Sequence, residues 1–423
     1  MGMHKSDVAS SPSWGNQMAG LEGLRGLAAY SVVSAHILFL MGDAVTGGQG
    51  YGLRHGLTLF FALSGFLLYR PFALSILNQT KPPSTLRFYI NRIIRIYPAY
   101  ISILLLTSYG LKAANITTGT AETHGTLEPL PLLANLSLFQ TLAPETFHTG
   151  LSASWSITVE LTFYLLLPFL VAAAQAASRN TPKSLTASLP AAFLLTVGLS
   201  SKYWIIKSTT NLNSEQIQEF FWSADWTGVF THSIAAHADL FAFGMVAATI
   251  SAWLETSKRQ QKQISAARLA SYVIILAAGG FGFNGAVGSF GDTAIAAACA
   301  ALILLIALPK DRVTQLLVRV LDLRVPKYLG KISYSVYLWH IPVIVWFTQR
   351  RFGQDVNWSQ LYVDAIIVFT ATTALSVLTY HLVEYPALRL KRRTDGRPNK
   401  HADDKTNTET ESTAAAKLSN GQQ

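Results

Sequence analysis

Long apolar stretches alternate with shorter polar connectors along most of this chain. A helix needs about 20 mostly apolar residues to cross a hydrocarbon core about 30 Å thick. Ten stretches meet that description, although the seventh is short and rich in glycine; they are residues 21–41, 53–77, 92–111, 155–174, 185–201, 230–253, 268–283, 291–309, 330–349 and 360–385. The pattern predicts an all-α, polytopic membrane bundle of about ten transmembrane helices.

The composition agrees with a membrane protein. Half of the residues are hydrophobic and only 13% are charged, whereas soluble domains average about 25% charged residues. The net charge of +10 does not indicate nucleic acid as a partner, because the position of the cations relative to the membrane explains it. Cys299 is the single cysteine, so an intrachain disulfide is excluded.

The cations are distributed unevenly among the connectors. The four even-numbered connectors hold twelve Lys or Arg residues, whereas the five odd-numbered connectors are longer in total and hold five. By the positive-inside rule, the even connectors and both termini are cytoplasmic. We therefore expect a multi-pass protein of the plasma or inner membrane, with a cytoplasmic N-terminal segment at 1–20, a membrane domain at 21–390 and a disordered cytoplasmic tail at 391–423. The polar start predicts no cleaved signal peptide.

Arg25 and His36 both lie in the first apolar stretch. Eleven helical steps make about three turns, so both side chains leave the same face, about 16 Å apart along the axis. Ionisable residues inside a membrane are costly and are functional-site hypotheses by default. The alternative is an interhelical polar contact that only holds the bundle together.

Glu160 is predicted at nearly the same depth as His36, because it lies five residues inside the outer end of an antiparallel helix. A carboxylate beside an imidazole fixes its tautomer and raises its basicity, as general-base catalysis requires. The matched depth therefore predicts that Glu160 and His36 pair.

Cations also gather where several predicted helices meet the cytoplasm. Guanidinium groups bind phosphate well, so these side chains predict a basic mouth for a phosphorylated ligand. For Arg87 and Lys331, contact with anionic lipid is an equal alternative. The set consists of Arg25, Arg70, Arg87, Arg92, Arg95 and Lys331.

Further polar residues lie within the predicted helices. For the small pair Ser64-Gly65, close helix packing is favoured over catalysis. A covalent acyl intermediate on Ser64 remains an alternative. Glu384 is interpreted as part of a structural helix stop. The possible acceptor-site or pocket residues are Ser64, Trp155, Asp239, Tyr334 and His340. No metal-ligand spacing and no phosphate-binding loop occurs, so no metal is expected.

Six ordered motifs resemble the acyltransferase 3 family of integral-membrane O-acyltransferases over about residues 20–385. They are GLRGLAAYSVVSAH, LFFALSGFLLYRPF, RIIRIYPAY, SWSITVELTFY, DLFAFGM and LGKISYSVYLWHIPV, closed by VEYP. The resemblance implies that His36 activates an acceptor hydroxyl, that Arg25 lies near the phosphates of an acyl-CoA donor, and that Arg92 and Arg95 assist it.

We therefore predict an acyl-CoA-dependent O-acyltransferase, with acetyl-CoA as the expected donor and no metal. Its partners are the lipid bilayer and a hydroxyl on a glycan, glycolipid or secreted small molecule, as in O-acetylation of cell-envelope carbohydrate. The alternative is a polytopic transporter or flippase, which also uses intramembrane charges. A relative that has lost catalysis is a third possibility. The sequence leaves the acyl length, the acceptor and the oligomeric state open.

Overall fold

The structure is a computed structural model that describes residues 19–46, 53–118, 123–178, 180–257, 261–284, 289–309, 311–350 and 357–394. Nearly all of the predicted N-terminal segment, and the predicted tail beyond Thr394, lie outside the described residues.

Ten long helices correspond to the ten predicted stretches, which confirms the all-α membrane bundle. They are α1 (Leu21–Thr46), α2 (Gly56–Leu77), α3 (Thr85–Leu105), α5 (Trp155–Ala177), α6 (Lys183–Thr209), α9 (Ile234–Thr256), α10 (Gln261–Asn284), α11 (Ser289–Ala307), α13 (Arg324–Thr348) and α14 (Trp358–Thr379). Nine helical segments of the described chain are long and apolar enough to cross a membrane. The tenth, α13, is more polar, yet its 25 residues extend about 38 Å.

Several helices are longer than their apolar stretches. Helix α3 begins at Thr85 instead of residue 92, after Ser84 accepts a hydrogen bond from a backbone N–H of the first turn. Helix α6 continues to Thr209, although its stretch was predicted to end at residue 201. Lys202 was predicted to lie in a connector. This prediction is wrong, because Lys202 is a buried residue within α6. A hydropathy pattern detects only the part of a helix in hydrocarbon.

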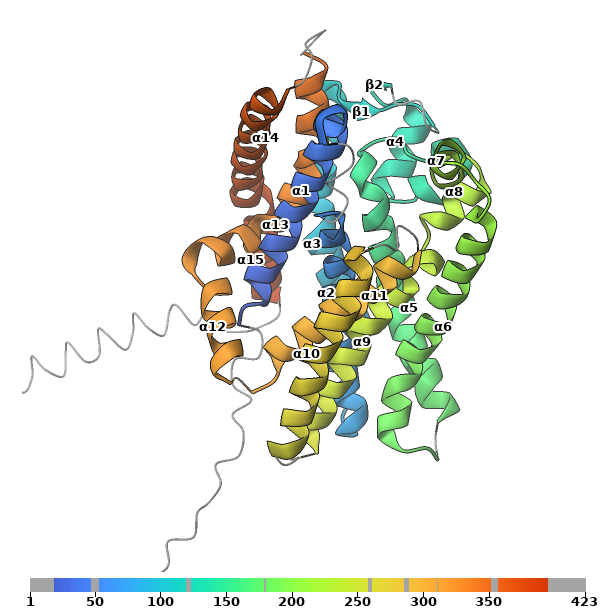
Figure 1. The fold of residues 1–423 in the computed structure, drawn as a ribbon, viewed down its shortest axis with the longest axis vertical. Helices are drawn as coiled ribbons and strands as arrows, with labels where there is room; N and C mark the ends of the chain where they lie inside the picture. The colour runs from blue at the N-terminus through green and yellow to red at the C-terminus, as the bar shows by residue number, and fades with distance from the viewer. Residues whose placement is uncertain are drawn as a thin grey trace, which may run out of the picture.

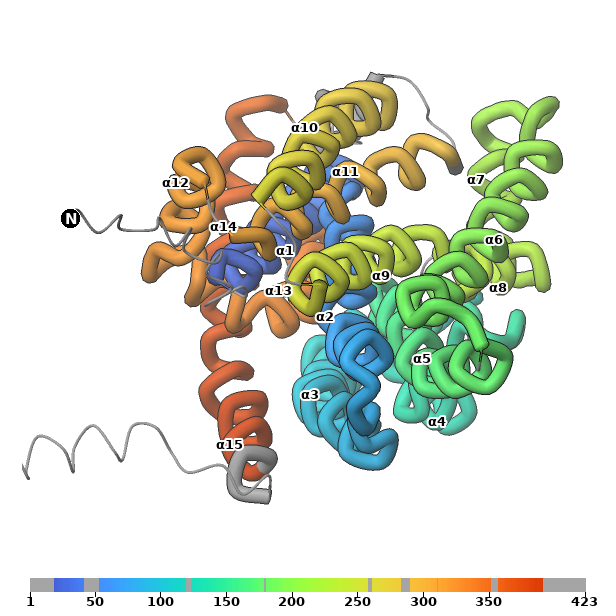
Figure 2. The backbone as a smooth tube through the Cα atoms, turned by 90° about the horizontal axis from the view of Figure 1, so that it is seen from below, coloured from blue at the N-terminus to red at the C-terminus, as the bar shows by residue number. Residues whose placement is uncertain are grey.

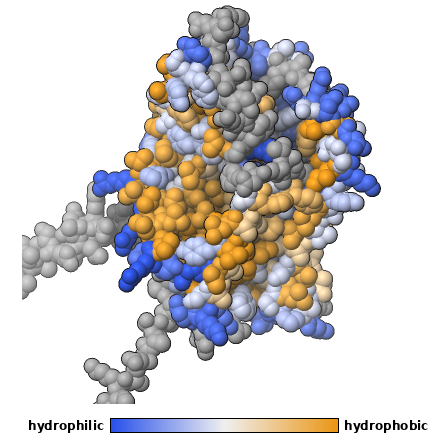
Figure 3. All heavy atoms as spheres, viewed as in Figure 1, coloured by the Kyte–Doolittle hydropathy of each residue, from blue (hydrophilic) through white to orange (hydrophobic). Residues whose placement is uncertain are grey.

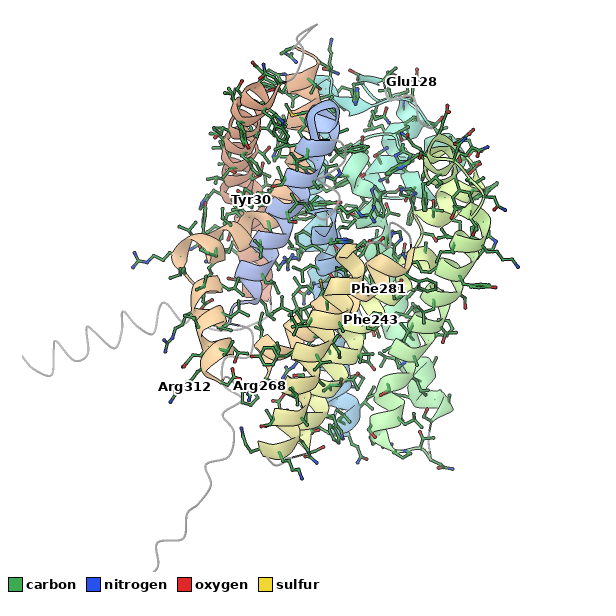
Figure 4. All side chains as sticks on the ribbon, viewed as in Figure 1. Tyr30, Glu128, Phe243, Arg268, Phe281 and Arg312 are labelled. Atoms are coloured by element: carbon green, nitrogen blue, oxygen red, sulfur yellow. The ribbon has the colours of Figure 1, made fainter. Side chains whose placement is uncertain are left out.

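Short elements gather at the upper end in Figure 1: α4 (Pro129–Leu136), α7 (Ser214–Trp222), α8 (Trp226–Thr231) and the antiparallel pair β1 (Ala114–Asn115) and β2 (His124–Gly125). They belong to the two long odd-numbered connectors. At the lower end, the amphipathic α12 (Arg312–Leu321) is tied to α10 by an ion pair of 3.0 Å between Arg268 and Asp311, near the labels in Figure 4. Membrane sidedness itself stays a prediction.

Helix α2 lies near the centre of the bundle and packs on α9, as Figure 2 shows from below. Glycine makes this contact close. A Cβ added to Gly65 would lie 2.2 Å from the carbonyl oxygen of Phe241, and one added to Gly244 would lie 2.0 Å from that of Ala62. The two backbones touch directly, which supports the packing interpretation of Gly65.

Helices α1 and α13 form a second close pair. A Cβ added to Gly330 would lie 1.8 Å from the carbonyl oxygen of Glu22, and one added to Gly26 would lie 2.8 Å from the backbone nitrogen of Gly330. Helix α1 also contacts α14, where the hydroxyl of Tyr30, labelled in Figure 4, lies 2.7 Å from the Thr373 hydroxyl. Helix α1 is therefore fixed against two neighbours.

The surface matches this architecture. Apolar side chains form a band across the middle of the face shown in Figure 3, and hydrophilic side chains gather toward its upper and lower ends. A soluble protein rarely exposes so large an apolar area, and a bilayer covers such a band. The chain is a multi-pass membrane protein.

Candidate active site

The carboxylate of Glu160, on α5, links its own helix to α2. Its Oε1 accepts hydrogen bonds from the hydroxyl of Ser64 on α2 and from the hydroxyl of Tyr164 one turn further along α5. The i, i+4 spacing of Glu160 and Tyr164 and the contact of α5 with α2 bring three polar groups together inside the bundle. Glu160 therefore has two hydrogen bonds from protein hydroxyls to its Oε1.

Arg25 and Arg92 both interact electrostatically with this carboxylate, and Arg95 interacts with both arginines. Arg25 of α1 interacts electrostatically with Glu160, Arg92 and Arg95. We call these four residues and Tyr164 the arginine–glutamate cluster. The structure thus brings together three of the six cations of the predicted basic mouth, Arg25, Arg92 and Arg95.

Two guanidinium groups of the cluster each have an N–H donor that makes no hydrogen bond to the described part of the chain. The Nε atoms of Arg25 and Arg92 are buried and have no hydrogen-bond partner among the described residues. A buried donor without an acceptor costs about 1–3 kcal/mol, and more when it is charged. Such donors fit a phosphate or carboxylate of a ligand.

A second carboxylate lies beside the cluster. Glu384 accepts a hydrogen bond from Ser335 of α13 and interacts electrostatically with Arg25 and Arg95. It ends a π-helical turn, Tyr380–Glu384, that joins α14 to α15 (Tyr385–Thr394). A π turn inserts an extra residue into a helix, so Glu384 is turned inward. Glu384 was interpreted only as part of a helix stop, and that interpretation did not include its contacts with Ser335 and the arginines.

His36 pairs with another imidazole. Its ring lies 4.9 Å from that of His340 on α13, at an interplanar angle of 62°. The Nδ1 of His36 lies 2.9 Å from the carbonyl oxygen of Val32, and that of His340 lies 2.5 Å from the carbonyl oxygen of Tyr337. A carbonyl only accepts, so each Nδ1 is the donor and each Nε2 carries a lone pair.

The predicted pairing of His36 with Glu160 is not found among the described contacts. His36 takes its tautomer from a backbone carbonyl one turn earlier on its own helix, while Glu160 is occupied by Ser64 and Tyr164. Equal depth on two helices does not specify their angular positions in the bundle. A carboxylate is therefore not what orients this imidazole.

Other predicted site residues lie elsewhere. Arg70 forms an ion pair with Glu255 of α9. Tyr334 donates a hydrogen bond of 3.0 Å to the carbonyl oxygen of Ile96 and interacts electrostatically with both Glu160 and Glu384, at the edge of the cluster. Arg87 and Lys331 are exposed.

Asp239 belongs to a separate polar group between α9 and α11. It is fully buried, accepts a hydrogen bond of 2.5 Å from Thr293 and interacts electrostatically with Lys202 and Asp292. The structure does not place it beside His36 or Glu160.

Trp155 lies among histidines where α5 begins. Its ring centroid is 4.8 Å from that of His232 and 5.3 Å from that of His237. His148, in the connector before α5, packs 4.6 Å from Trp222 and 5.5 Å from His232. Burial, and then the charge of His232, lower the pKa of His148 to about 3.

Within the described residues, no group of three or more acidic, histidine or cysteine side chains could hold a metal ion.

Tyr164 was not predicted as a site residue, although its position four residues after Glu160 places both on one helix face. The pairing of His36 with His340 had no local signal, because it depends on the packing of α1 against α13.

Comparison with known proteins identifies the family. The model of the acyltransferase domain of the acyltransferase 3 family matches residues 18–381. The chain is 27% identical over 393 residues to BcsY of Komagataeibacter xylinus, provisionally named a membrane-bound transacylase; the match covers 89% of this chain and 85% of that protein. It is 29% identical over 168 residues to nodulation protein 10 of Rhizobium leguminosarum bv. viciae, covering 35% of this chain and 42% of that protein. No solved structure matches. The chain belongs to the acyltransferase 3 family.

Proposed function

We propose that this protein is an acyl-CoA-dependent O-acyltransferase whose acceptor is a hydroxyl on a glycan, glycolipid or secreted small molecule. Membership of an acyltransferase family and similarity to a protein named as a transacylase support acyl transfer. The observation that carries the proposal is on α1. There, the unpartnered Arg25 donor and the His36 base lie eleven residues apart, about 16 Å along one helix face.

Acyl-CoA has its phosphates and its thioester at opposite ends. Arg25, with Arg95 beside it, binds the phosphates, and the thioester extends toward His36. The positive-inside pattern favours entry of the donor from the cytoplasm. A secreted or envelope acceptor then meets the thioester from the other side.

His36 acts as the general base in this mechanism. Val32 holds Nδ1 as the donor, so the Nε2 lone pair accepts the proton of the acceptor hydroxyl. The oxygen attacks the thioester carbon, the C–S bond breaks, and the CoA thiolate takes the proton back from the His36 imidazolium. His340 packs edge-on against His36 and acts as a positioning residue.

Ser64 supports a second route to the same products. Its hydroxyl donates to Glu160, so a carboxylate base lies beside a possible nucleophile. In that route, the Ser64 oxygen attacks the thioester carbon, Glu160 takes the hydroxyl proton, and the C–S bond breaks with release of CoA as the thiol. The acceptor hydroxyl then displaces Ser64 from the acyl ester.

The test is transfer by the purified protein in liposomes, with acyl-CoA on one face. Release of CoA thiol and transfer of labelled acetyl to envelope glycan or lipid are both measured. We expect His36→Ala to lower transfer by about 10²- to 10⁴-fold, the usual contribution of a general base. His381→Ala is the matched control, because that histidine is exposed and contacts Tyr328.

A folded His36→Ala protein with full transfer activity contradicts the proposal. Glycan uptake without release of CoA indicates the transporter alternative instead. The acceptor is then identified by mass spectrometry of envelope glycans, lipids and secreted metabolites with and without the gene, as a missing acyl mass.

A further inference from the structure

A groove of about 400 Å³ runs between α3 and α5, which lie side by side in Figure 2. Its outer rim is apolar and open. Ile93 of α3 is 50% exposed, Leu165 of α5 is 42% exposed, and Phe139 of the preceding connector is 48% exposed. Because these side chains belong to membrane-spanning helices or lie directly beside them, the groove opens toward the hydrocarbon of the bilayer.

A charged residue forms part of the inner wall of the groove. Arg92 and Tyr164 both line it, and the Arg92 guanidinium carbon lies 5.7 Å from the Tyr164 ring centroid. The Nε of Arg92 is buried without a hydrogen-bond partner in the described chain. Arg92 therefore has a hydrogen-bond donor that the described chain does not use, and such buried donors are rare without a ligand or water.

The depth of Arg92 suits a lipid headgroup. It lies seven residues after the start of α3 at Thr85, about 10 Å along the axis. The headgroup and interfacial regions add about 5–8 Å on each side of the roughly 30 Å core. A helix that begins at the membrane surface therefore places Arg92 a few ångströms inside the hydrocarbon, and its long side chain extends back to the interface. Basic pockets between transmembrane helices bind anionic headgroups in this way.

We propose that this groove binds a phosphate-bearing membrane lipid, with one hydrocarbon chain between α3 and α5 and the phosphate on Arg92. The acyl chain of the donor fits less well, because in acyl-CoA the phosphates and the acyl group are at opposite ends. In a phospholipid, the phosphate lies directly beside the chains, as Arg92 lies beside the apolar wall. The inference assigns Arg92 to this lipid and leaves Arg25 and Arg95 to the acyl-CoA phosphates, so it does not depend on the acyl-transfer mechanism.

Photocrosslinking of the full-length protein in lipid nanodiscs tests it. One probe is phosphatidylglycerol with a diazirine in its acyl chain, and the other is diacylglycerol with the same chain and no phosphate. Labelled peptides are identified by mass spectrometry. We expect phosphatidylglycerol to label the segments 89–97 and 161–165 at least about tenfold more than diacylglycerol, the factor associated with one charge-assisted hydrogen bond.

Two variants on adjacent positions separate the groove from the general lipid surface. Leu165→Trp fills the groove and should abolish most of the labelling. Leu166→Trp is the matched control, because Leu166 is also on α5 and 38% exposed but does not line the groove. Arg92→Gln should lower phosphatidylglycerol labelling to the diacylglycerol level.

Thermal unfolding in the same nanodiscs confirms that each variant is folded. Equal labelling of the Leu165→Trp and Leu166→Trp proteins overturns the proposed groove site. Equal labelling by the two probes overturns recognition of the phosphate. Neither result depends on whether acyl transfer is observed.

Discussion

The close contact of α1 with α13 makes Gly330 a sensitive position for activity. In Gly330→Ala, the new Cβ would lie 1.8 Å from the carbonyl oxygen of Glu22, whereas ordinary contact begins at 3.4 Å. The helices must therefore separate by roughly 1.6 Å at this point. Overpacking of this kind costs about 1–3 kcal/mol, and alanine regains up to about 1 kcal/mol through its higher helix propensity.

The catalytic effect should exceed the effect on stability. Separation of α1 from α13 moves His36 away from His340, whose rings are now 4.9 Å apart. A displacement of about 1 Å in a catalytic group can cost about 100-fold in rate. We therefore expect Gly330→Ala to insert into the membrane and fold, but to lose about 100-fold in acyl transfer.

The assay compares liposome transfer rates and thermal unfolding of Gly330→Ala with those of Gly280→Ala. Gly280 lies in α10, and a Cβ added there meets nothing within 4 Å, so its substitution should leave the rate unchanged. If the two variants have equal rates, the contact between α1 and α13 does not position the reacting groups.

Three further predictions concern single side chains. Arg25→Gln should raise the KM for acyl-CoA about tenfold or more through loss of one charge-assisted hydrogen bond, and an unchanged KM would remove Arg25 from the donor site. Ser64→Ala should keep transfer within about tenfold if His36 is the base, whereas an acyl adduct on Ser64 in the native protein, seen by mass spectrometry, would favour the covalent route. His148 has a pKa of about 3, below its usual 6.5, so the unfolded chain binds more protons between these values and stability falls as pH drops below 6.5. At pH 5 the loss from this one group is about 2 kcal/mol; His148→Phe should make the acid-induced decrease in the unfolding temperature smaller by that contribution, and an identical decrease in both proteins would refute the assignment.

The sequence was sufficient to predict the long helices because hydropathy and length are local properties. It placed their ends wrongly where polar turns continue a helix beyond the hydrocarbon, as at Thr85 in α3 and at Thr209 in α6. The short elements α7 and α8 have capped starts, at Asn213 and Asp225, but too few apolar residues to produce a membrane signal.

The types of site residue could also be predicted, because an arginine, a histidine or a glutamate inside an apolar stretch is conspicuous. Their partners could not. Depth along a helix follows from residue number, but the direction that a helix face takes depends on its neighbours. For this reason Glu160 was matched to His36 by depth, although in the folded bundle it faces Ser64 and the arginines.

The π-helical turn at Tyr380–Glu384 makes the chain length in this region as important as its composition. One residue corresponds to about 100° of helical rotation. Deleting a single codon within the turn would restore regular α-helical spacing while α14 and α15 keep their places, because the turn holds the one extra residue. Glu384 would then lose the widened turn that directs its carboxylate toward Ser335 and Arg25, although every side chain of the cluster would still be encoded. For this segment, a change of length by one residue is a more severe mutation than most substitutions.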